Sequence, residues 1–301
     1  MAQDCGFVGL GQMGAPMARN LLKAEPLTVV SRRPQQAADF AALGARVVAD
    51  AGGLAGCDLV FLCLPDGKVV EDVLFGVPSL ARVLPPGAAI VDTSTIEYQR
   101  TLTIAERLKA DGLTYIDAPV SGMQARAEAG TLTMMCGGEA AAIERVRPAC
   151  ARMASTILHM GAVGSGQLAK LINQLLFDIN AAALAEILPV AVKLGLDPEK
   201  TATIVNSGTG RSYASEFFVP NILRGEFSKG YPLAAAYKDL VSGAELSAVN
   251  AIPMPLLAAA TAIYQAALLA GHGEKDKGGM ICHIEDRLGV AFRANATGDG
   301  A

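Results

Sequence analysis

Residues 6–22, GFVGLGQMGAPMARNLL, carry the clearest indication of how the first half of this chain folds. It begins inside an apolar run, residues 5–10, that is typical of a buried strand. Glycines follow at Gly9, Gly11 and Gly14, and residues 12–24 have the composition of a helix. A strand, a glycine-rich turn and a helix in this order predict the opening unit of a parallel α/β sheet.

The same alternation continues through the first half of the chain. Short apolar runs rich in Val, Ile and Leu are typical of parallel strands that helices cover on both faces. Strands are predicted at 5–10, 27–31, 45–48, 58–64, 88–94 and 114–119, and helices at 12–24, 34–43 and 97–110. A further strand–helix–strand unit is predicted at 131–137, 139–152 and 155–161. This order predicts a doubly wound parallel sheet of the Rossmann type.

Strand signals largely vanish after Gly166. Residues 167–195 predict one long helix, kinked or adjusted by Pro189, and further helices are predicted after Pro198 and over 239–251 and 254–271. We therefore expect a dinucleotide-binding α/β domain over residues 1–162 and an all-helical domain over 163–290. Residues 291–301 are expected to form a loose tail.

The glycine pattern G-x-G-x-x-G indicates dinucleotide binding when a strand precedes it and a helix follows. The first glycine permits a tight turn, the second lets the backbone approach a pyrophosphate, and the third lets the helix pack closely on the sheet. The unpaired N–H groups at the helix start then face the phosphates. A purely structural turn is the alternative. The predicted cofactor contacts in this turn are Gly9, Leu10, Gly11, Gln12, Met13 and Gly14.

The end of the second predicted strand bears on which dinucleotide binds. NAD-binding chains commonly place an acidic residue here to hold the ribose 2′-hydroxyl, whereas this chain has Ser31, Arg32 and Arg33. No carboxylate repels a 2′-phosphate, and two guanidinium groups can pair with one. These residues favour NADP(H) and leave NAD possible, the alternative being that the arginines are solvated turn residues.

Two further loops follow predicted strands at the edge of the sheet where such folds bind ligands. Leu64 and Pro65 lie in the first and are candidates to line the cofactor site. Thr95, with Ser94, lies in the second and is a candidate contact for cofactor or substrate. Ordinary loop chemistry is the alternative for each.

Composition excludes several other classes of protein. The net charge is −4 with no basic stripe, so nucleic acid is not expected as a partner. The most apolar segment, residues 175–192, carries Asp178 and Glu186 and is expected to be too polar for a membrane span. The start of the chain lacks the pattern of a signal peptide.

Six scattered cysteines are expected to be free thiols in a reducing, cytoplasmic compartment. Three histidines far apart in sequence make a metal site improbable.

Four motifs occur in order along most of the chain: GFVGLGQMGAPMARNL at 6–21, DAPVSGMQARAEAGTL at 117–132, GAVGSGQLAKLINQ at 161–174 and YKDL at 237–240. Together they resemble the β-hydroxyacid dehydrogenases, which include 3-hydroxyisobutyrate dehydrogenase, tartronate semialdehyde reductase and glyoxylate/succinic semialdehyde reductase. The resemblance runs from about residue 4 to residue 290. It implies an N-terminal Rossmann domain, a long connecting helix and a helical domain that helps to form homodimers or homotetramers.

The resemblance also implies roles for residues of the second motif. Ser121, Gly122 and the backbone N–H of residue 123 are the implied binding groups for a substrate carboxylate. The family usually has a second glycine at this third position, and this chain has Met123. The backbone donor survives this change, but a larger side chain is expected at the mouth of the site.

In the third motif, Lys170 matches the family's general acid/base. When a carbonyl is reduced, a positioned ammonium supplies the proton and stabilises the negative charge on oxygen. Asn173, three residues further along the same helix face, is implied to orient Lys170 or to contact substrate. Some family members place this Asn one position later, where this chain has Gln174. A lysine that merely extends to solvent is the alternative for Lys170.

In the helical domain, Lys238 of the fourth motif matches a lysine that reaches the cofactor. Asp239 beside it is expected to fix local structure. Tyr231 and Arg211 are candidates for shaping the distal substrate pocket, and surface or packing roles are equally open for these two.

The leading hypothesis is an NADP(H)-preferring reductase that interconverts small carboxylated aldehydes, of the glyoxylate or succinic semialdehyde type, and hydroxy acids. The alternative is an NAD-dependent dehydrogenase of the 3-hydroxyisobutyrate type. A remote alternative is a dinucleotide-binding sensor without turnover. An imine reductase of similar fold is disfavoured because such enzymes generally lack the lysine seen here as Lys170.

Overall fold

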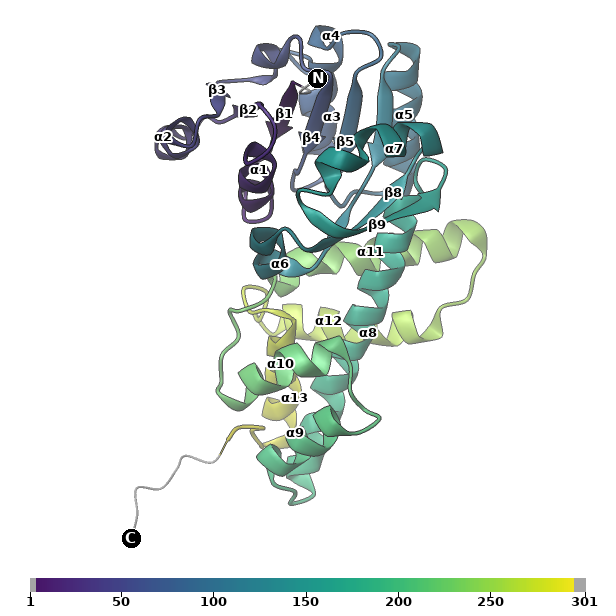
Figure 1. Cartoon of the computed structure of the whole chain (residues 1–301). Coiled ribbons are helices and arrows are strands. Elements are labelled where there is room, and N and C mark those ends of the chain that lie inside the picture. Colours follow the sequence, from purple (N-terminus) through teal and green to yellow (C-terminus); the bar gives the residue numbers. More distant parts are fainter. Residues whose placement is uncertain (1–3, 295–301) are drawn as a thin grey trace. The chain divides into compact units, whose positions relative to one another are not determined.

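The computed structural model describes residues 4–294 of the chain (Figure 1). The chain forms two compact units that divide between Lys170 and Leu171. Each unit has a hydrophobic core of its own, and the two are described separately below.

The first unit is built on one sheet, which has nine strands within residues 4–294. The strands are β1 Cys5–Val8, β2 Leu27–Val30, β3 Arg46–Val48, β4 Leu59–Leu62, β5 Ala89–Asp92, β6 Thr114–Asp117, β7 Val120–Ser121, β8 Leu132–Gly137 and β9 Ala154–Gly161. Their order is β3-β2-β1-β4-β5-β6-β8-β7, and β9 pairs with β8. The order reverses next to β1, which is the arrangement of a doubly wound sheet and confirms the predicted fold class.

The strands β1 to β6 pair in parallel, as predicted. The direction changes at β8, which runs antiparallel to both β6 and β7. A parallel return needs a crossover of a dozen or more residues, but only residues 122–131, which include the short helix over 123–129, separate β7 from β8, so the chain turns back after β7. The predicted final unit is present, because β8 and β9 are parallel and α7 connects them.

Helices cover both faces of this sheet (Figure 1). They are α1 Gly14–Leu22, α2 Pro34–Ala42, α3 Gly67–Phe75, α4 Leu80–Val83, α5 Tyr98–Ala110, α6 Met123–Ala129 and α7 Ala140–Cys150, with a 3₁₀ turn η1 at Ala51–Leu54. One core joins α1, α2, α6 and α7 to the face that carries Phe7 and Phe61, and a second joins α3, α4 and α5 to the opposite face. Helices α3, α4 and α6 were not predicted from the sequence.

The second unit, as far as residue 294, consists of helices. They are α8 Ser165–Lys193, which begins in the first unit, α9 Pro198–Ser207, α10 Tyr213–Leu223, α11 Leu233–Asn250, α12 Pro255–Leu269, α13 Ile281–Leu288 and the 3₁₀ turn η2 Lys277–Met280. The long predicted helix is confirmed as α8, which continues through Pro189 as a single helix. Helix α11 begins six residues before its predicted start, because the YKDL motif lies inside it.

The first residues of the expected tail are packed. Phe292 is fully buried, and its backbone N–H donates to Oε1 of Glu285 at 2.7 Å. Arg293 pairs with the same carboxylate at 2.7 Å, and the N–H of Ala294 donates to the carbonyl of Leu223 at 2.9 Å. The remainder of the expected tail, residues 295–301, lies outside the described residues.

All six cysteines lie within the described part of the chain and all are free thiols, as predicted. Burial raises the pKa of Cys5 to about 12 and that of Cys63 to about 11, so both thiols stay protonated at neutral pH. Over residues 4–294, no group of three or more His, Cys, Asp or Glu side chains is placed to hold a metal ion.

By length and composition alone, α8 is apolar enough to cross a membrane, and it is the one such helix between residues 4 and 294. This differs from the expectation that residues 175–192 are too polar for a membrane span. Core helices of globular proteins meet the same criteria. In the middle of α8, Asp178 is fully buried and forms an ion pair with Lys277 of η2, and the hydroxyl of Tyr264 donates to it at 3.0 Å. Helix α8 therefore packs in the core of the second unit through a polar cluster as well as apolar contacts.

The Asp178–Lys277 pair gives the first testable prediction. Burial raises the pKa of Asp178 to about 6, against the attraction of Lys277, so the carboxylate depends on its partner. Lys277→Met should lower the free energy of unfolding by about 3–5 kcal/mol, because a buried charge loses its counter-ion. Adding Asp178→Asn removes that charge and should recover most of the loss. Urea titrations at one protein concentration measure both, and equal stability of the single and double variants would contradict the prediction.

Candidate active site

The glycine turn after β1 has the close contacts that two of its glycines predict. Gly9 has a φ of +101°, and a Cβ there would lie 2.2 Å from the carbonyl oxygen of Cys63. A Cβ at Gly14 would lie 1.8 Å from the carbonyl oxygen of Gly9. Both glycines are therefore required by the packing of the chain on itself.

Gly11 is different, because within residues 4–294 a Cβ at this position would have no heavy atom within 4 Å apart from its chain neighbours. Its φ is also not in the left-handed region. No described part of the chain requires glycine there, so the missing side chain leaves the backbone open to a ligand. The N–H groups at the start of α1 follow at once, and together they fit the pyrophosphate of a dinucleotide.

Side chains around this turn connect it to its neighbours. The amide of Gln12 donates to the Oε1 of Gln124 in α6 at 2.8 Å. Leu10 is buried in the core, while Met13 is half-buried at the start of α1. The turn is thus held against the segment that follows Ser121.

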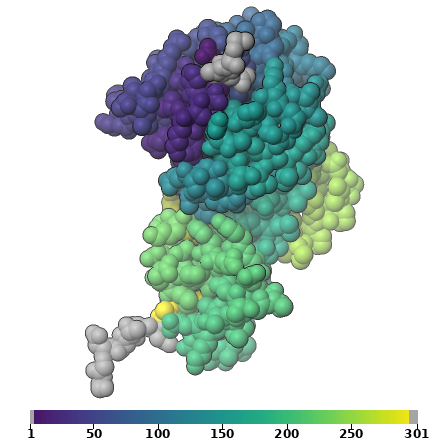
Figure 2. Space-filling view, viewed as in Figure 1, coloured from purple at the N-terminus to yellow at the C-terminus, as the bar shows by residue number. Residues whose placement is uncertain are grey.

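The end of β2 presents the residues that bear on the choice of dinucleotide. Arg32 and Arg33 are exposed, and the surface of this part of the unit is formed by α2 and the loop before it (indigo, Figure 2). The hydroxyl of Ser31 lies 3.2 Å from the Oε1 of Gln36, whose Nε2 donates to the carbonyl of Leu10 at 2.7 Å. Gln36 therefore ties Ser31 to the glycine turn, a role that the sequence analysis missed.

The loops after β4 and β5 are joined at the carboxyl edge of the sheet. The backbone N–H of Leu64 donates to the hydroxyl of Ser94 at 2.9 Å. Asp66 caps α3 by accepting from the N–H of Val69 at 2.9 Å. Leu64 is half-buried, and Thr95 lies half-buried directly after Ser94. Pro65, in the same loop as Leu64, completes this group of predicted cofactor contacts.

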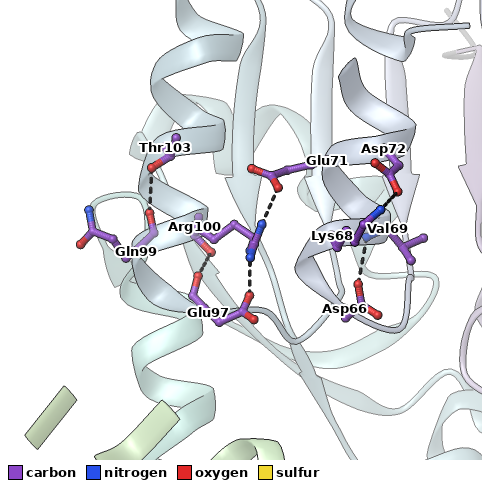
Figure 3. A network of polar contacts seen from close by, with 10 residues as sticks. Asp66, Lys68, Val69, Glu71, Asp72, Glu97, Gln99, Arg100 and Thr103 are labelled. Atoms are coloured by element: carbon purple, nitrogen blue, oxygen red, sulfur yellow. Dashed lines mark hydrogen bonds and ion pairs between the residues drawn. The ribbon is translucent and has the colours of Figure 1, made fainter. Parts of the chain in front are cut away.

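An ion-pair network supports the helices that start at these loops (Figure 3). Arg100 of α5 pairs with Glu71 of α3 and, at 3.1 Å, with Glu97. A Cβ at Gly67 would lie 2.2 Å from the Cδ of Arg100, so glycine leaves the space through which the arginine passes. On the exposed side of α3, Lys68 pairs with Asp72 at 2.7 Å. The network fixes α3 against α5 beside the carboxyl edge.

The motif that begins at Asp117 places Ser121 at the end of β7, paired with Thr133 of β8. Gly122 has a φ of +139°, and a Cβ there would lie 2.9 Å from the Cβ of Arg126. Met123 then starts α6 with a φ of +59°, in the left-handed region that side-chain-bearing residues rarely adopt. The backbone after Ser121 is therefore held in a conformation that suits glycine at both positions.

Met123 gives a second prediction. A non-glycine residue in the left-handed region costs about 1–2 kcal/mol, and glycine avoids this cost at the expense of extra entropy in the unfolded chain. Met123→Gly should therefore raise the free energy of unfolding by roughly 0.5–1 kcal/mol. Met123→Val should lower it, since branching at Cβ makes this conformation worse. Thermal melts of the two variants beside the parent are the measurement, and the same melting temperature for both variants would refute the argument.

The start of α8 is fastened to the ends of two strands. Asp117, fully buried at the end of β6, accepts from the N–H of Gly164 at 2.7 Å and from the N–H of Gln167 at 2.9 Å. Burial raises its pKa to about 6, and the two N–H donors act against this shift. The side chain of Gln167 donates to the carbonyl of Ser94 at 2.7 Å and accepts from the N–H of Ile96 at 3.2 Å.

Lys170 follows one turn later on α8 and is only 9% exposed. Because the first turn of α8 is bonded to the ends of β5 and β6, Lys170 belongs to the same unit as Thr95 and Ser121. Asn173 is exposed one turn beyond Lys170 on the same helix, in the second unit.

The other predicted site residues lie in the second unit. Tyr231 is about half-exposed at 51%, and burial of its hydroxyl end raises its pKa. Lys238 lies on α11 beside the buried Asp239, whose Oδ2 accepts from Gln174 at 3.0 Å. The expected structural role of Asp239 is consistent with this bond. Arg211 is exposed and lies 3.6 Å from Glu216.

Comparison with known proteins agrees with this arrangement. Residues 4–161 match the family model described as the NAD binding domain of 6-phosphogluconate dehydrogenase. Residues 164–284 match the model described as NAD-binding of NADP-dependent 3-hydroxyisobutyrate dehydrogenase. The two matches together span both units of the chain.

Individual relatives match over nearly their whole length. The chain is 37% identical to 2-(hydroxymethyl)glutarate dehydrogenase of Eubacterium barkeri, covering 95% of this chain and 96% of that protein. It is 35% identical to an NAD-dependent L-serine dehydrogenase of Pseudomonas aeruginosa, covering 91% and 95%. The solved structure of Mycobacterium tuberculosis 3-hydroxyisobutyrate dehydrogenase with L-serine matches at a TM-score of 0.85 and 31% identity, covering 94% and 99%. With its dinucleotide turn, its doubly wound sheet and these full-length matches, the chain belongs to the β-hydroxyacid dehydrogenase family of NAD(P)-dependent oxidoreductases.

Proposed function

We propose that this enzyme is an NADP(H)-preferring reductase that interconverts small carboxylated aldehydes, of the glyoxylate or succinic semialdehyde type, and the corresponding hydroxy acids. The observation that carries the proposal is Lys170: a buried amine on a helix turn that is bonded to the carboxyl ends of β5 and β6. This is the edge at which sheets of this kind bind their ligands.

The bound nicotinamide supplies hydride in the reduction and accepts it in the oxidation. In the reduction, the Lys170 ammonium donates a proton to the carbonyl oxygen and stabilises the charge that develops there. In the oxidation, the neutral amine takes the hydroxyl proton. Ser121, Gly122 and the N–H of Met123 are proposed to hold the substrate carboxylate, which fixes the reacting carbon near Lys170.

Roles in the second unit rest on the family resemblance. Asn173 is proposed to orient Lys170 or to contact the substrate, Lys238 to contact the cofactor, and Tyr231 to shape the distal part of the substrate site. Thr95 is proposed to contact cofactor or substrate from the loop after β5.

The preference for NADP(H) is supported by Ser31, Arg32 and Arg33, where no carboxylate is present and both arginines are exposed. Arg32→Ala with Arg33→Ala should raise the KM for NADPH about 10- to 100-fold, because hydrogen bonds to a charged phosphate contribute about 1.5–3 kcal/mol. The KM for NADH should change little. The measurement is steady-state kinetics with each dinucleotide across a panel of semialdehydes and hydroxy acids.

Arg82→Ala, an exposed arginine at the end of α4, is the matched control and should leave both KM values unchanged. Faster turnover of the parent enzyme with NADH at matched concentrations would rule out the NADP(H) preference. The second candidate function would then stand: an NAD-dependent dehydrogenase of the 3-hydroxyisobutyrate type. The NAD-dependent L-serine dehydrogenase among the relatives favours this candidate. A dinucleotide-binding sensor without turnover is the remote alternative, and the complete absence of turnover in the panel would support it.

A homodimer or homotetramer is proposed, formed through the helical unit. The α8 side chains Ile172, Leu176, Ile187 and Val190 are exposed at spacings that keep them near one side of the helix. A row of exposed apolar side chains on one helix supports the proposed interface. Light scattering on the purified protein tests this, and a monomer at micromolar concentration would contradict it. A cytoplasmic location is proposed from the free thiols.

A further inference from the structure

The side chain of Gln167 makes two hydrogen bonds to the backbone of the loop after β5. Its amide donates to the carbonyl of Ser94 and accepts from the N–H of Ile96, at 2.7 and 3.2 Å. These are the backbone groups on either side of Thr95, so one side chain fixes the backbone of the loop residue proposed to contact cofactor or substrate. Gln167 is 3% exposed, so neither bond is exchanged readily for one to water.

The backbone of the same helix turn is held from the sheet. Asp117 accepts from the N–H groups of Gly164 and Gln167. A Cβ at Gly166 would lie 2.3 Å from the carbonyl oxygen of Met135 and 2.8 Å from the carboxylate of Asp117. The glycine therefore lets the first turn of α8 press directly against the ends of β6 and β8, where it has little freedom to shift.

Lys170 lies three residues after Gln167, so the two side chains are neighbours on the surface of α8. A movement of the first turn away from Thr95 would carry Lys170 with it, since the helix is continuous. The Gln167 amide thus connects the loop of Thr95 to the helix turn that presents the amine.

We propose that Gln167 is a positioning residue that keeps Lys170 in register with the Thr95 loop, a role that rests on the proposed function of Lys170 as proton donor and acceptor. Displacing a reacting group by about 1 Å can lower a rate about 100-fold. A purely structural Gln167 would affect stability without selectively affecting kcat.

Gln167→Met preserves most of the side-chain volume and removes both hydrogen bonds. It should lower kcat about 10- to 100-fold while KM and the Kd for NADPH each stay within about threefold. Gln167→Asn, which is polar but too short for both bonds, should show the same pattern and serves if the Met variant folds poorly. Thr101→Val is the control, because it removes the hydrogen bond that the hydroxyl of the buried Thr101 donates to the carbonyl of Glu97 in the same unit.

The control should lower the melting temperature by a similar amount and keep kcat. A drop in kcat that the control shares, or unchanged kcat in both Gln167 variants, overturns the proposal.

A double-mutant cycle separates this proposal from the proposed function. In a Lys170→Met background, Gln167→Met should change the residual rate less than threefold, because it acts through an amine that is already gone. An undiminished effect in that background overturns the positioning role. If Lys170→Met itself leaves kcat unchanged, the proposed proton donor is wrong, and this is seen before Gln167 is altered.

Discussion

Lys170→Met is expected to lower kcat about 1,000-fold while the Kd for NADPH stays within about threefold. The variant keeps the length of the side chain and removes the group that donates the proton and stabilises the charge on oxygen, effects that contribute about 100- to 10,000-fold and 100- to 1,000-fold in other enzymes. Stopped-flow measurement of hydride transfer with a semialdehyde substrate gives the rate, and fluorescence titration with NADPH gives the affinity.

Lys109→Met, at the exposed end of α5, is the matched control and should behave as the parent enzyme. A Lys170 variant that turns over at the parental rate would remove the assigned acid and base. A variant that loses NADPH binding together with turnover would place Lys170 in cofactor binding and leave the proton donor open. The comparison also distinguishes an enzyme from a sensor. An enzyme turns over in the parent form and loses turnover but not NADPH binding in the Lys170 variant, whereas a sensor shows no turnover in either form.

Gly11→Ala is expected to weaken NADPH binding about 10- to 100-fold and to leave the fold intact. Among the described residues the added methyl group meets no heavy atom within 4 Å beyond its chain neighbours, so stability should change by less than about 1 kcal/mol. A pyrophosphate held against Gly11 would meet that methyl group, and inserting a methyl group into a close contact costs about 1–3 kcal/mol. Calorimetric titration with NADPH, paired with a thermal melt, measures both effects.

Gly14→Ala is the informative contrast, because its Cβ would lie 1.8 Å from the carbonyl oxygen of Gly9. That variant should lose stability and binding together. If Gly11→Ala bound NADPH as tightly as the parent, the pyrophosphate would not lie against this turn.

Prediction from sequence succeeded where the signal is local. The order of strand, turn and helix around Gly9 follows from apolar periodicity and from glycine spacing within about twenty residues, and the structure confirms it. The long helix through Pro189 was predictable for the same reason. Helix α6 was missed because seven residues leave too few turns to show a period. Helix α3 was missed although its nine residues make it as long as α1 and α2, which were predicted.

Parts of the candidate site had no local signal at all. Gln167 bonds to Ser94, 73 residues away, and its N–H bonds to Asp117, 50 residues away. A glutamine on a helix predicts neither partner, and an aspartate at the end of a strand does not reveal that it will hold the start of another helix. The family motifs imply roles for Ser121 and Lys170, but they do not indicate what holds either residue in place.

The class of sheet, the glycine turn for a dinucleotide and the family could be read from the amino-acid sequence alone, since each depends on neighbouring residues or on ordered motifs. Three features became visible only in the folded chain: β8 runs antiparallel to β6, Met123 adopts a left-handed backbone, and Gln167 bonds to the backbone on both sides of Thr95. The difference arises from distance along the chain. Hydrophobic periodicity and the backbone freedom of glycine influence only a few neighbouring residues, whereas a buried hydrogen bond or a close backbone contact forms only once distant segments have packed together.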